Sequence, residues 1–309
     1  MLKPWFFFLA LVITCAGLLV SGGEGKAGYP QEIIDGLGRK VIISERPEKI
    51  VSLGPANTEI LFAIGAGGNL VGVTTHCDFP SQAEKIDKIG DYTTPNIEAI
   101  VDKKPDLIVA CYGNKEESVQ RLRELGLAVV TLHPKSVEEI LENIQLLGGI
   151  TGYEQEAASL VKTLKKRIKI VKEKSSKIPE GEKPRILYVV WYPELWIAGK
   201  GTFANGLMEM AGGKNIAFDI EGWKIISKEV VIGRDPEIIF CSGMGESLTI
   251  LREKILEDVD LKKVSAIEHN RVYAIASDIV ELPSSRIVDG LEKIHYYVNY
   301  YAKITEVNK

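Results

Sequence analysis

The sequence has few of the residues from which metal centres, disulfide frameworks and catalytic sites are built. Its 309 residues include only four cysteines and four histidines. It contains no CxxC pair and no cysteine–histidine grouping at the spacing of a zinc site. It also contains no GxSxG, HExxH or protein-kinase signature. No local motif therefore encodes structural zinc or a set of catalytic acid, base and nucleophile, and we do not expect an enzyme.

The low cysteine count also excludes a complete disulfide framework. Removal of the N-terminal segment described below leaves Cys77, Cys111 and Cys241, which is an odd number. Cys111 and Cys241 lie at the ends of predicted buried strands, where a free cysteine behaves as a small hydrophobic residue. The sequence leaves open whether these two cysteines pair.

No charge of one sign dominates the chain. Lysine and arginine total 38, aspartate and glutamate total 42, and the formal net charge is −4. Nucleic-acid binding normally requires a basic surface, so we expect no nucleic-acid partner. The hydrophobic fraction of 45% is ordinary for a globular protein, and the length is sufficient for two domains.

Long hydrophobic runs are lacking, apart from one at the N-terminus. Lys3 precedes an apolar run from Trp5 to Val20, and a polar, glycine-rich stretch follows. The run is shorter than the roughly 20 residues of a membrane-spanning helix but long enough for a secretory signal. We therefore assign residues 1–28 to a signal peptide and short linker. We expect an exported protein, in the periplasm or on the outer face of the cell membrane.

Part of this run, Val12–Cys15, resembles the cleavage site of bacterial lipoproteins, in which the cysteine is lipidated and becomes the new N-terminus. Thr14 departs from the glycine, alanine or serine that usually precedes that cysteine. We prefer lipidation of Cys15 as the interpretation, which makes the protein lipid-anchored. An uncleaved anchor and ordinary cleavage are the alternatives.

Two segments with the same pattern organise the remainder of the chain. Asn96–Ala110, NIEAIVDKKPDLIVA, aligns without a gap with Ser227–Cys241, SKEVVIGRDPEIIFC. Each begins with a helix-capping residue, and a glutamate two positions later complements the helix dipole. A proline then ends the helix, and an apolar run indicates a buried strand. The pattern predicts a similar α/β lobe in each half, with Glu98 and Glu229 at corresponding positions.

A long helical pattern without glycine or proline separates the two halves. Apolar residues recur at helical spacing over 157–168, and Ile178–Pro184, with its prolines and glycine, ends the helix. We predict an N-terminal α/β lobe at residues 29–151, a linking helix at 152–178 and a C-terminal α/β lobe at 179–309. The predicted fold class is α/β: two Rossmann-like lobes with central sheets, joined by one long rigid helix, with a ligand cleft between the lobes.

Large aromatic residues in the loops at strand ends are candidates for gripping a ligand between the lobes. These residues are Phe79 and Tyr92 in the first lobe and Trp191, Tyr192, Trp196 and Trp223 in the second. His76 lies in a similar loop beside Asp78, where it could line the cleft or ligate a metal that the ligand carries. A lone histidine is more often an ordinary surface residue, and an aromatic residue beside a strand is often part of the core.

Four segments carry a family resemblance. They are SLGPANTEILFAIG at Ser52–Gly65, DFP at Asp78–Pro80, NIEAIVDKKPDLIV from Asn96, and SSRIVDGLE in the last helix. Together with the signal sequence and the two lobes, they resemble the substrate-binding proteins of ABC importers for metal chelates, namely cobalamin, ferric siderophores and haem. The resemblance covers the chain from about Pro47 to Tyr301 and is strongest to the cobalamin-binding branch.

The resemblance implies binding without catalysis and without a cofactor. A monomeric protein would capture cobalamin or a related corrinoid and deliver it to the permease dimer of an ABC transporter in the membrane. Glu98 and Glu229 match the two glutamates that engage arginines of the permease. The positions that the resemblance assigns to ligand binding are His76, Tyr92, Trp196, Trp223, Asp278 and Glu281.

Three of these positions depart from the cobalamin-binding pattern. His76 replaces a tyrosine, Tyr92 a tryptophan and Trp196 a phenylalanine, so a ferric siderophore or haem is an alternative ligand. From another class, an exported two-lobed enzyme acting on a tetrapyrrole, such as a chelatase, would have the same architecture. An extracellular sensor subunit would share both the fold and the ligand.

Overall fold

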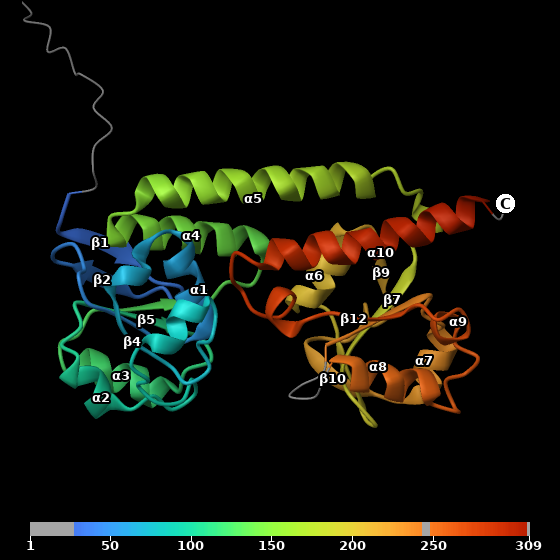
Figure 1. Ribbon diagram of the computed structural model, residues 1–309, viewed down its shortest axis with the longest axis horizontal. Helices are drawn as coiled ribbons and strands as arrows, with labels where there is room; N and C mark the ends of the chain where they lie inside the picture. The colour runs from blue at the N-terminus through green and yellow to red at the C-terminus, as the bar shows by residue number, and fades with distance from the viewer. Residues whose placement is uncertain (1–27, 243–247, 308–309) are drawn as a thin grey trace, which may run out of the picture.

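Two α/β lobes lie side by side in the computed structural model, which describes residues 28–242 and 248–307 (Figure 1). A single long helix, α5 (Glu154–Ser175), lies along one side of both lobes. The predicted fold class, two lobes with central sheets joined by one long helix, is confirmed. The predicted signal peptide and Cys15 lie outside the described residues. Among the residues that are described, no helix is both long and apolar enough to cross a membrane.

The N-terminal lobe is built on a four-stranded parallel sheet of order β4-β3-β5-β6. Its strands are β3 (Ile50–Ser52), β4 (Leu70–Val73), β5 (Leu107–Cys111) and β6 (Val129–Leu132). Its helices are α1 (Pro55–Ala63), α2 (Ile97–Asp102), α3 (Glu116–Glu124) and α4 (Val137–Thr151), with short 3-10 turns η1 (Ala66–Asn69) and η2 (Ser81–Lys85). An N-terminal hairpin is formed by β1 (Gln31–Ile34) and β2 (Lys40–Ile43).

The C-terminal lobe has a mixed six-stranded sheet of order β10-β8-β7-β11-β12, with β9 paired to β7. Its strands are β7 (Arg185–Trp191), β8 (Leu195–Ala198), β9 (Lys214–Asn215), β10 (Trp223–Ile226), β11 (Ile238–Cys241) and β12 (Val272–Ala274). Its helical segments are η3 (Glu180–Glu182), α6 (Phe203–Met210), α7 (Lys228–Arg234), α8 (Leu248–Glu257), α9 (Ser265–Glu268), η4 (Ser277–Ile279) and α10 (Ile287–Val307). Strand β8 is antiparallel because residues 192–194 turn the chain back onto β7.

The repeated segments occupy equivalent places in the two sheets. In the first lobe α2 leads into β5, which pairs in parallel with β3; in the second lobe α7 leads into β11, which pairs in parallel with β7. The cap predicted at Asn96 is confirmed, because its side chain accepts a hydrogen bond from the Ala99 N–H at 3.1 Å. The cap predicted at Ser227 is confirmed in position only, because Ser227 is the N-cap residue of α7 but its side chain accepts no backbone hydrogen bond. Ser227 precedes α7, but its hydroxyl binds the carboxylate of Glu229 and leaves the backbone uncapped.

Helix α1 begins at Pro55, because proline is favoured in the first helical turn, and Asn57 and Thr58 lie within the helix rather than capping it. The Asn57 side chain instead donates a hydrogen bond to the Val109 carbonyl of β5 at 3.1 Å, and Thr58 Oγ1 donates one to Ser52 Oγ at 2.8 Å. These buried bonds fix the first turn of α1 on the sheet.

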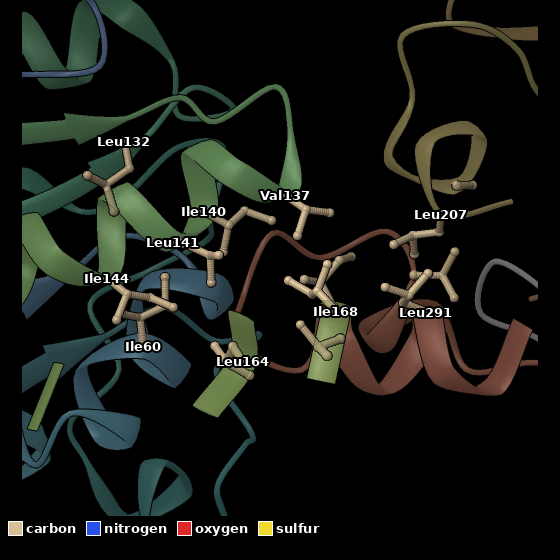
Figure 2. Close-up of a cluster of buried hydrophobic side chains, with 14 of the residues drawn as sticks. Ile60, Leu132, Val137, Ile140, Leu141, Ile144, Leu164, Ile168, Leu207 and Leu291 are labelled. Carbon is tan, nitrogen blue, oxygen red and sulfur yellow. The ribbon is translucent and has the colours of Figure 1, made fainter. Parts of the chain in front are cut away.

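The long helix is packed against both lobes. Its buried side chains follow one stripe and are Ala157, Val161, Leu164, Ile168, Val171 and Ser175. Leu164 and Ile168 lie between α4 of the first lobe and Leu207 and Leu291 of the second, so one apolar core continues across both lobes (Figure 2). A fully buried leucine or isoleucine contributes about 1.5–3 kcal/mol. Helix α5 is therefore held rigidly along its length.

All three cysteines of the described chain are free. Burial raises the pKa of Cys111 to about 11 and that of Cys241 to about 12, while Cys77 is 1% exposed. Because the thiolate is the reactive form, alkylation of the native mature protein at pH 8 should be about 100-fold slower than for an exposed thiol. Mass spectrometry after iodoacetamide treatment would show it, with urea-unfolded protein as the control. Rapid native labelling would contradict the raised pKa values.

Candidate functional site

A cavity of about 330 Å³ lies where the two lobes meet. On the side of the N-terminal lobe, the cavity is lined by residues that follow β3 and β4 in the chain. On the side of the C-terminal lobe, it is lined by the segment between β12 and α10. It is lined by Pro55, Glu59, His76, Asp78, Ser277, Asp278, Glu281, Leu282 and Arg286. Ligands of open α/β sheets bind beyond the carboxyl ends of the strands, which is where these residues lie.

His76 stands at this cavity in a defined orientation. Its Nε2 lies 3.1 Å from Asp91 Oδ2. Hydrogen bonds from the Thr93 hydroxyl and N–H, and then the bond with His76, lower the pKa of Asp91 to about 2. Asp91 is therefore a carboxylate at neutral pH and accepts the hydrogen bond, which makes His76 Nε2 the donor. A carboxylate that orients a histidine in this way leaves the other ring nitrogen for a ligand or its metal.

Asp278 and Glu281 bring two acidic side chains to the same cavity from the C-terminal lobe. Glu281 Oε1 accepts a hydrogen bond from the hydroxyl of buried Tyr188 at 2.9 Å. Trp223 packs edge-on against Tyr188, with ring centroids 6.2 Å apart and planes inclined by 61°. Trp223 is therefore connected to Glu281 through Tyr188, although it does not line the cavity itself.

The cavity is acidic. Four carboxylates, those of Glu59, Asp78, Asp278 and Glu281, face one guanidinium, that of Arg286. That guanidinium is paired with both Glu59 and Asp278, and one positive charge against four carboxylates leaves an excess of negative charge around the cavity. Complementary charge favours a neutral or cationic ligand and disfavours one that carries carboxylates.

Tyr92 and Trp196 lie near the carboxyl ends of strands but do not line this cavity. The Tyr92 ring lies between the ends of β3 and β5, and a Cβ at Gly113 would lie 1.5 Å from its hydroxyl oxygen. A side chain at 113 would therefore displace the Tyr92 ring. Burial raises the pKa of Tyr92. Trp196 is paired across β7 and β8 with Trp191, and both rings are more than a third exposed.

Sequence reasoning missed a second aromatic pair. Tyr112 and His133 directly follow the paired strands β5 and β6, and their rings stack with centroids 3.8 Å apart and planes inclined by 3°. Tyr112 is 66% exposed. Burial and the charge of Lys135 lower the pKa of His133, so its ring is neutral at pH 7. Their positions immediately after two apolar runs were the only signal in the sequence.

The cavity residues Glu59, Asp78 and Arg286 were also missed as site residues. Each stands in a motif that carries the family resemblance, but the sequence does not show that the motifs meet. In the described part of the chain, no group of three or more histidine, cysteine, aspartate or glutamate residues is arranged to hold a metal ion.

Glu98 and Glu229 do not line the cavity, and the helices that carry them lie on the same side of the molecule. Both side chains are exposed, on α2 and α7 respectively. Figure 1 shows α2 and α7 at the edge of the two lobes that is opposite α5. A hydrogen bond from Ser227 lowers the pKa of Glu229, which keeps this carboxylate charged.

Two α/β lobes on a long helix, with a cavity between them, are the architecture of the two-lobed periplasmic binding proteins. The chain belongs to the periplasmic binding protein family, whose model matches residues 50–279. The family resemblance drawn from the sequence motifs is thereby confirmed.

Known proteins of this family resemble most of the chain. An uncharacterized ABC transporter substrate-binding lipoprotein of Bacillus subtilis is 32% identical over 86% of this chain and 84% of its own length. The crystal structure of a possible iron-binding periplasmic solute-binding protein from Staphylococcus epidermidis is 31% identical, with a TM-score of 0.71 over 82% of this chain and 99% of that chain. The periplasmic vitamin B12 binding protein of Vibrio cholerae is 26% identical, with a TM-score of 0.72 over 84% and 99%.

Proposed function

We propose that this protein is the substrate-binding component of an ABC importer and that it captures a corrinoid of the cobalamin type. It is exported, anchored to the membrane through a lipid on Cys15, and acts as a monomer without catalysis. The observation that carries the choice of ligand is the acidic cavity between the lobes. A relative that binds vitamin B12 and a lipoprotein relative of an ABC transporter support the assignment.

The charge of the cavity favours a corrinoid over haem. The edge of a corrin carries amide groups, which donate hydrogen bonds to carboxylates, whereas haem carries propionate carboxylates that Asp78, Asp278 and Glu281 would repel. A ferric hydroxamate complex, which is neutral or cationic, fits the same charge and is the second candidate. His76 could ligate the cobalt that a corrinoid carries, because Asp91 orients its ring.

The aromatic residues supply the apolar contacts of the proposed site. Tyr92 from the N-terminal lobe and Trp196 and Trp223 from the C-terminal lobe would pack against the macrocycle when it extends beyond the cavity. Glu98 and Glu229 would then dock into basic pockets of the permease dimer. Their exposure on one side of the molecule, one on each lobe, supports docking of both at once.

The ligand proposal is tested by titrating the mature protein with cyanocobalamin, haem and a ferric hydroxamate while recording visible absorbance and heat. We expect saturable binding of cyanocobalamin and much weaker binding of haem. Asp278→Asn and Glu281→Gln should each weaken cyanocobalamin binding about 10-fold or more, because a hydrogen bond to a charged group contributes about 1.5–3 kcal/mol.

The control is Glu117→Gln, which neutralises an exposed carboxylate on α3 and should leave affinity unchanged. Preferential binding of the ferric hydroxamate would show that the second candidate, and not a corrinoid, is the ligand. Preferential binding of haem would contradict the charge argument. Chemical conversion of a tetrapyrrole by the purified protein would favour the enzyme alternative over the binding protein.

A further inference from the structure

Three of the motifs that carry the family resemblance meet at one point between the lobes. Glu59 comes from the segment Ser52–Gly65, Phe79 from DFP, and Arg286 from SSRIVDGLE. Arg286 Nε donates to Glu59 Oε2 at 2.9 Å, and its Nη2 donates to the other oxygen of the same carboxylate. The guanidinium carbon of Arg286 lies 3.9 Å from the centroid of the Phe79 ring. We call Glu59, Phe79 and Arg286 the interlobe clasp.

Both ends of the ion pair are held by their own lobe. The Glu59 side chain is only 3% exposed and lies in the middle of α1, which is fixed to β3 and β5 by the bonds of Thr58 and Asn57 described above. Arg286 immediately precedes α10, and its backbone N–H donates to Ser284 Oγ at 3.2 Å. The clasp therefore joins two rigid elements directly.

The same guanidinium also contacts the ligand-binding segment. Arg286 Nη2 lies 3.4 Å from Oδ2 of Asp278, which is in η4. Helix α10 approaches η4 closely, because a Cβ at Gly290 would lie 1.8 Å from the Ile279 carbonyl oxygen. Movement of Arg286 would therefore shift the segment that carries Asp278 and Glu281.

We propose that Glu59 and Arg286 are positioning residues, which fix the separation of the lobes at the cavity and hold Asp278 and Glu281 where the ligand meets them. Helix α5 and its apolar core join the lobes along one side, and the clasp adds a second connection at the cavity itself. Two separate connections prevent the lobes from rotating about the axis of α5. The cleft is thereby formed before the ligand arrives.

The geometry requires arginine at 286. Its planar fork binds both oxygens of Glu59 and stacks on the face of Phe79, whereas a lysine ammonium is a point charge without a face to stack. Removing the positive partner would also leave the Glu59 carboxylate buried without compensation, which is costly. Arg286→Lys therefore retains the positive charge but loses the bidentate hydrogen bonding of the guanidinium. Glu59→Gln retains the shape of the side chain but loses its negative charge.

The experiment compares Glu59→Gln, Arg286→Lys and the double variant. The matched control is Arg167→Lys. The Arg167 guanidinium also donates two hydrogen bonds to one carboxylate, that of Glu292, at 2.9 and 2.6 Å. This pair joins α5 to α10 outside the cavity. Lobe separation in the ligand-free protein is measured by pulsed electron resonance between spin labels introduced at positions 117 and 257. Affinity is measured with cyanocobalamin as the probe.

Both single variants should broaden the distribution of lobe separations and weaken cyanocobalamin binding about 10-fold to 100-fold, the range typical of residues that orient a ligand-binding group. The affinity of the double variant for cyanocobalamin should lie within about threefold of the affinity of the weaker-binding single variant, because the two residues act as one unit. Arg167→Lys should leave both measurements unchanged.

The proposal would be overturned if Arg286→Lys and Glu59→Gln kept the wild-type lobe separation and the wild-type affinity, even if their thermal stability were reduced. Equal losses in Arg167→Lys would do so as well, because they would indicate general loosening. The affinity measurement rests on the proposed corrinoid function, whereas lobe separation does not. If the wild-type protein binds no cyanocobalamin, the corrinoid proposal fails and the distance measurement alone decides the role of the clasp.

Discussion

Replacing both Glu98 and Glu229 by alanine should abolish uptake of the ligand while leaving its affinity for the protein unchanged. Both carboxylates are exposed and do not line the cavity, and α2 and α7, which carry them, lie at the edge of the lobes opposite α5 (Figure 1). Truncating one partner of a charge pair that becomes desolvated at an interface costs about 2–5 kcal/mol. Loss of two such pairs should lower uptake by more than about 100-fold.

The measurement is uptake of labelled cobalamin by cells whose binding protein carries the double substitution, together with titration of the purified variant. The matched control replaces Glu117 and Glu257, which are exposed glutamates on α3 and α8, by alanine. The control should transport normally. Loss of ligand affinity in the Glu98 and Glu229 variant would place these residues in the binding site instead. Normal uptake would favour the sensor alternative or a different docking surface.

Asp35→Ala should destabilise the N-terminal lobe by about 3–5 kcal/mol, the effect of removing one partner of a buried ion pair. The Asp35 side chain is fully buried and lies 2.9 Å from Arg123 Nη2. It also accepts hydrogen bonds from the N–H groups of Leu37 at 3.0 Å, Arg39 at 2.9 Å and Thr131 at 3.3 Å. One carboxylate therefore joins the turn of the hairpin, helix α3 and strand β6.

Urea unfolding of the mature protein, followed by circular dichroism, would measure the loss of stability. Glu116→Ala is the control, because it removes the exposed Arg39–Glu116 pair of the same region and should cost less than about 1 kcal/mol. Asp35→Asn should fall between the two, since an amide oxygen still accepts hydrogen bonds but carries no charge. An Asp35→Ala midpoint close to that of the control would show that Arg123 finds another partner.

The elements that could be predicted from the sequence are those determined by local pattern. The hairpin at residues 31–44, the long helix and the repeated helix–strand segments follow from turn residues, helical spacing and apolar runs. Local pattern did not predict the hydrogen-bond partner of a side chain that has more than one possible partner. Ser227 stands at a helix start, as Asn96 does, yet its hydroxyl binds Glu229 rather than the backbone.

The candidate site was predictable only in part. His76, Asp278 and Glu281 were named from loops and from the family resemblance, and the structure places all three around one cavity. In the sequence, Glu59 and Arg286 were members of two separate motifs, and nothing marked them as a pair. Their pairing joins residues from opposite ends of the chain, and no periodicity or spacing encodes such a contact.

The sequence by itself determined two α/β lobes, a rigid linking helix and one exposed glutamate at the same place in each lobe, because each depends on residues close together in the chain. Only the tertiary structure decided that the cavity is acidic, that Asp35 is a buried hub, and that Glu59 and Arg286 clasp the lobes together. Charge, burial and pairing depend on which distant segments meet. That meeting is set by the packing of both lobes against α5, which the local sequence does not encode.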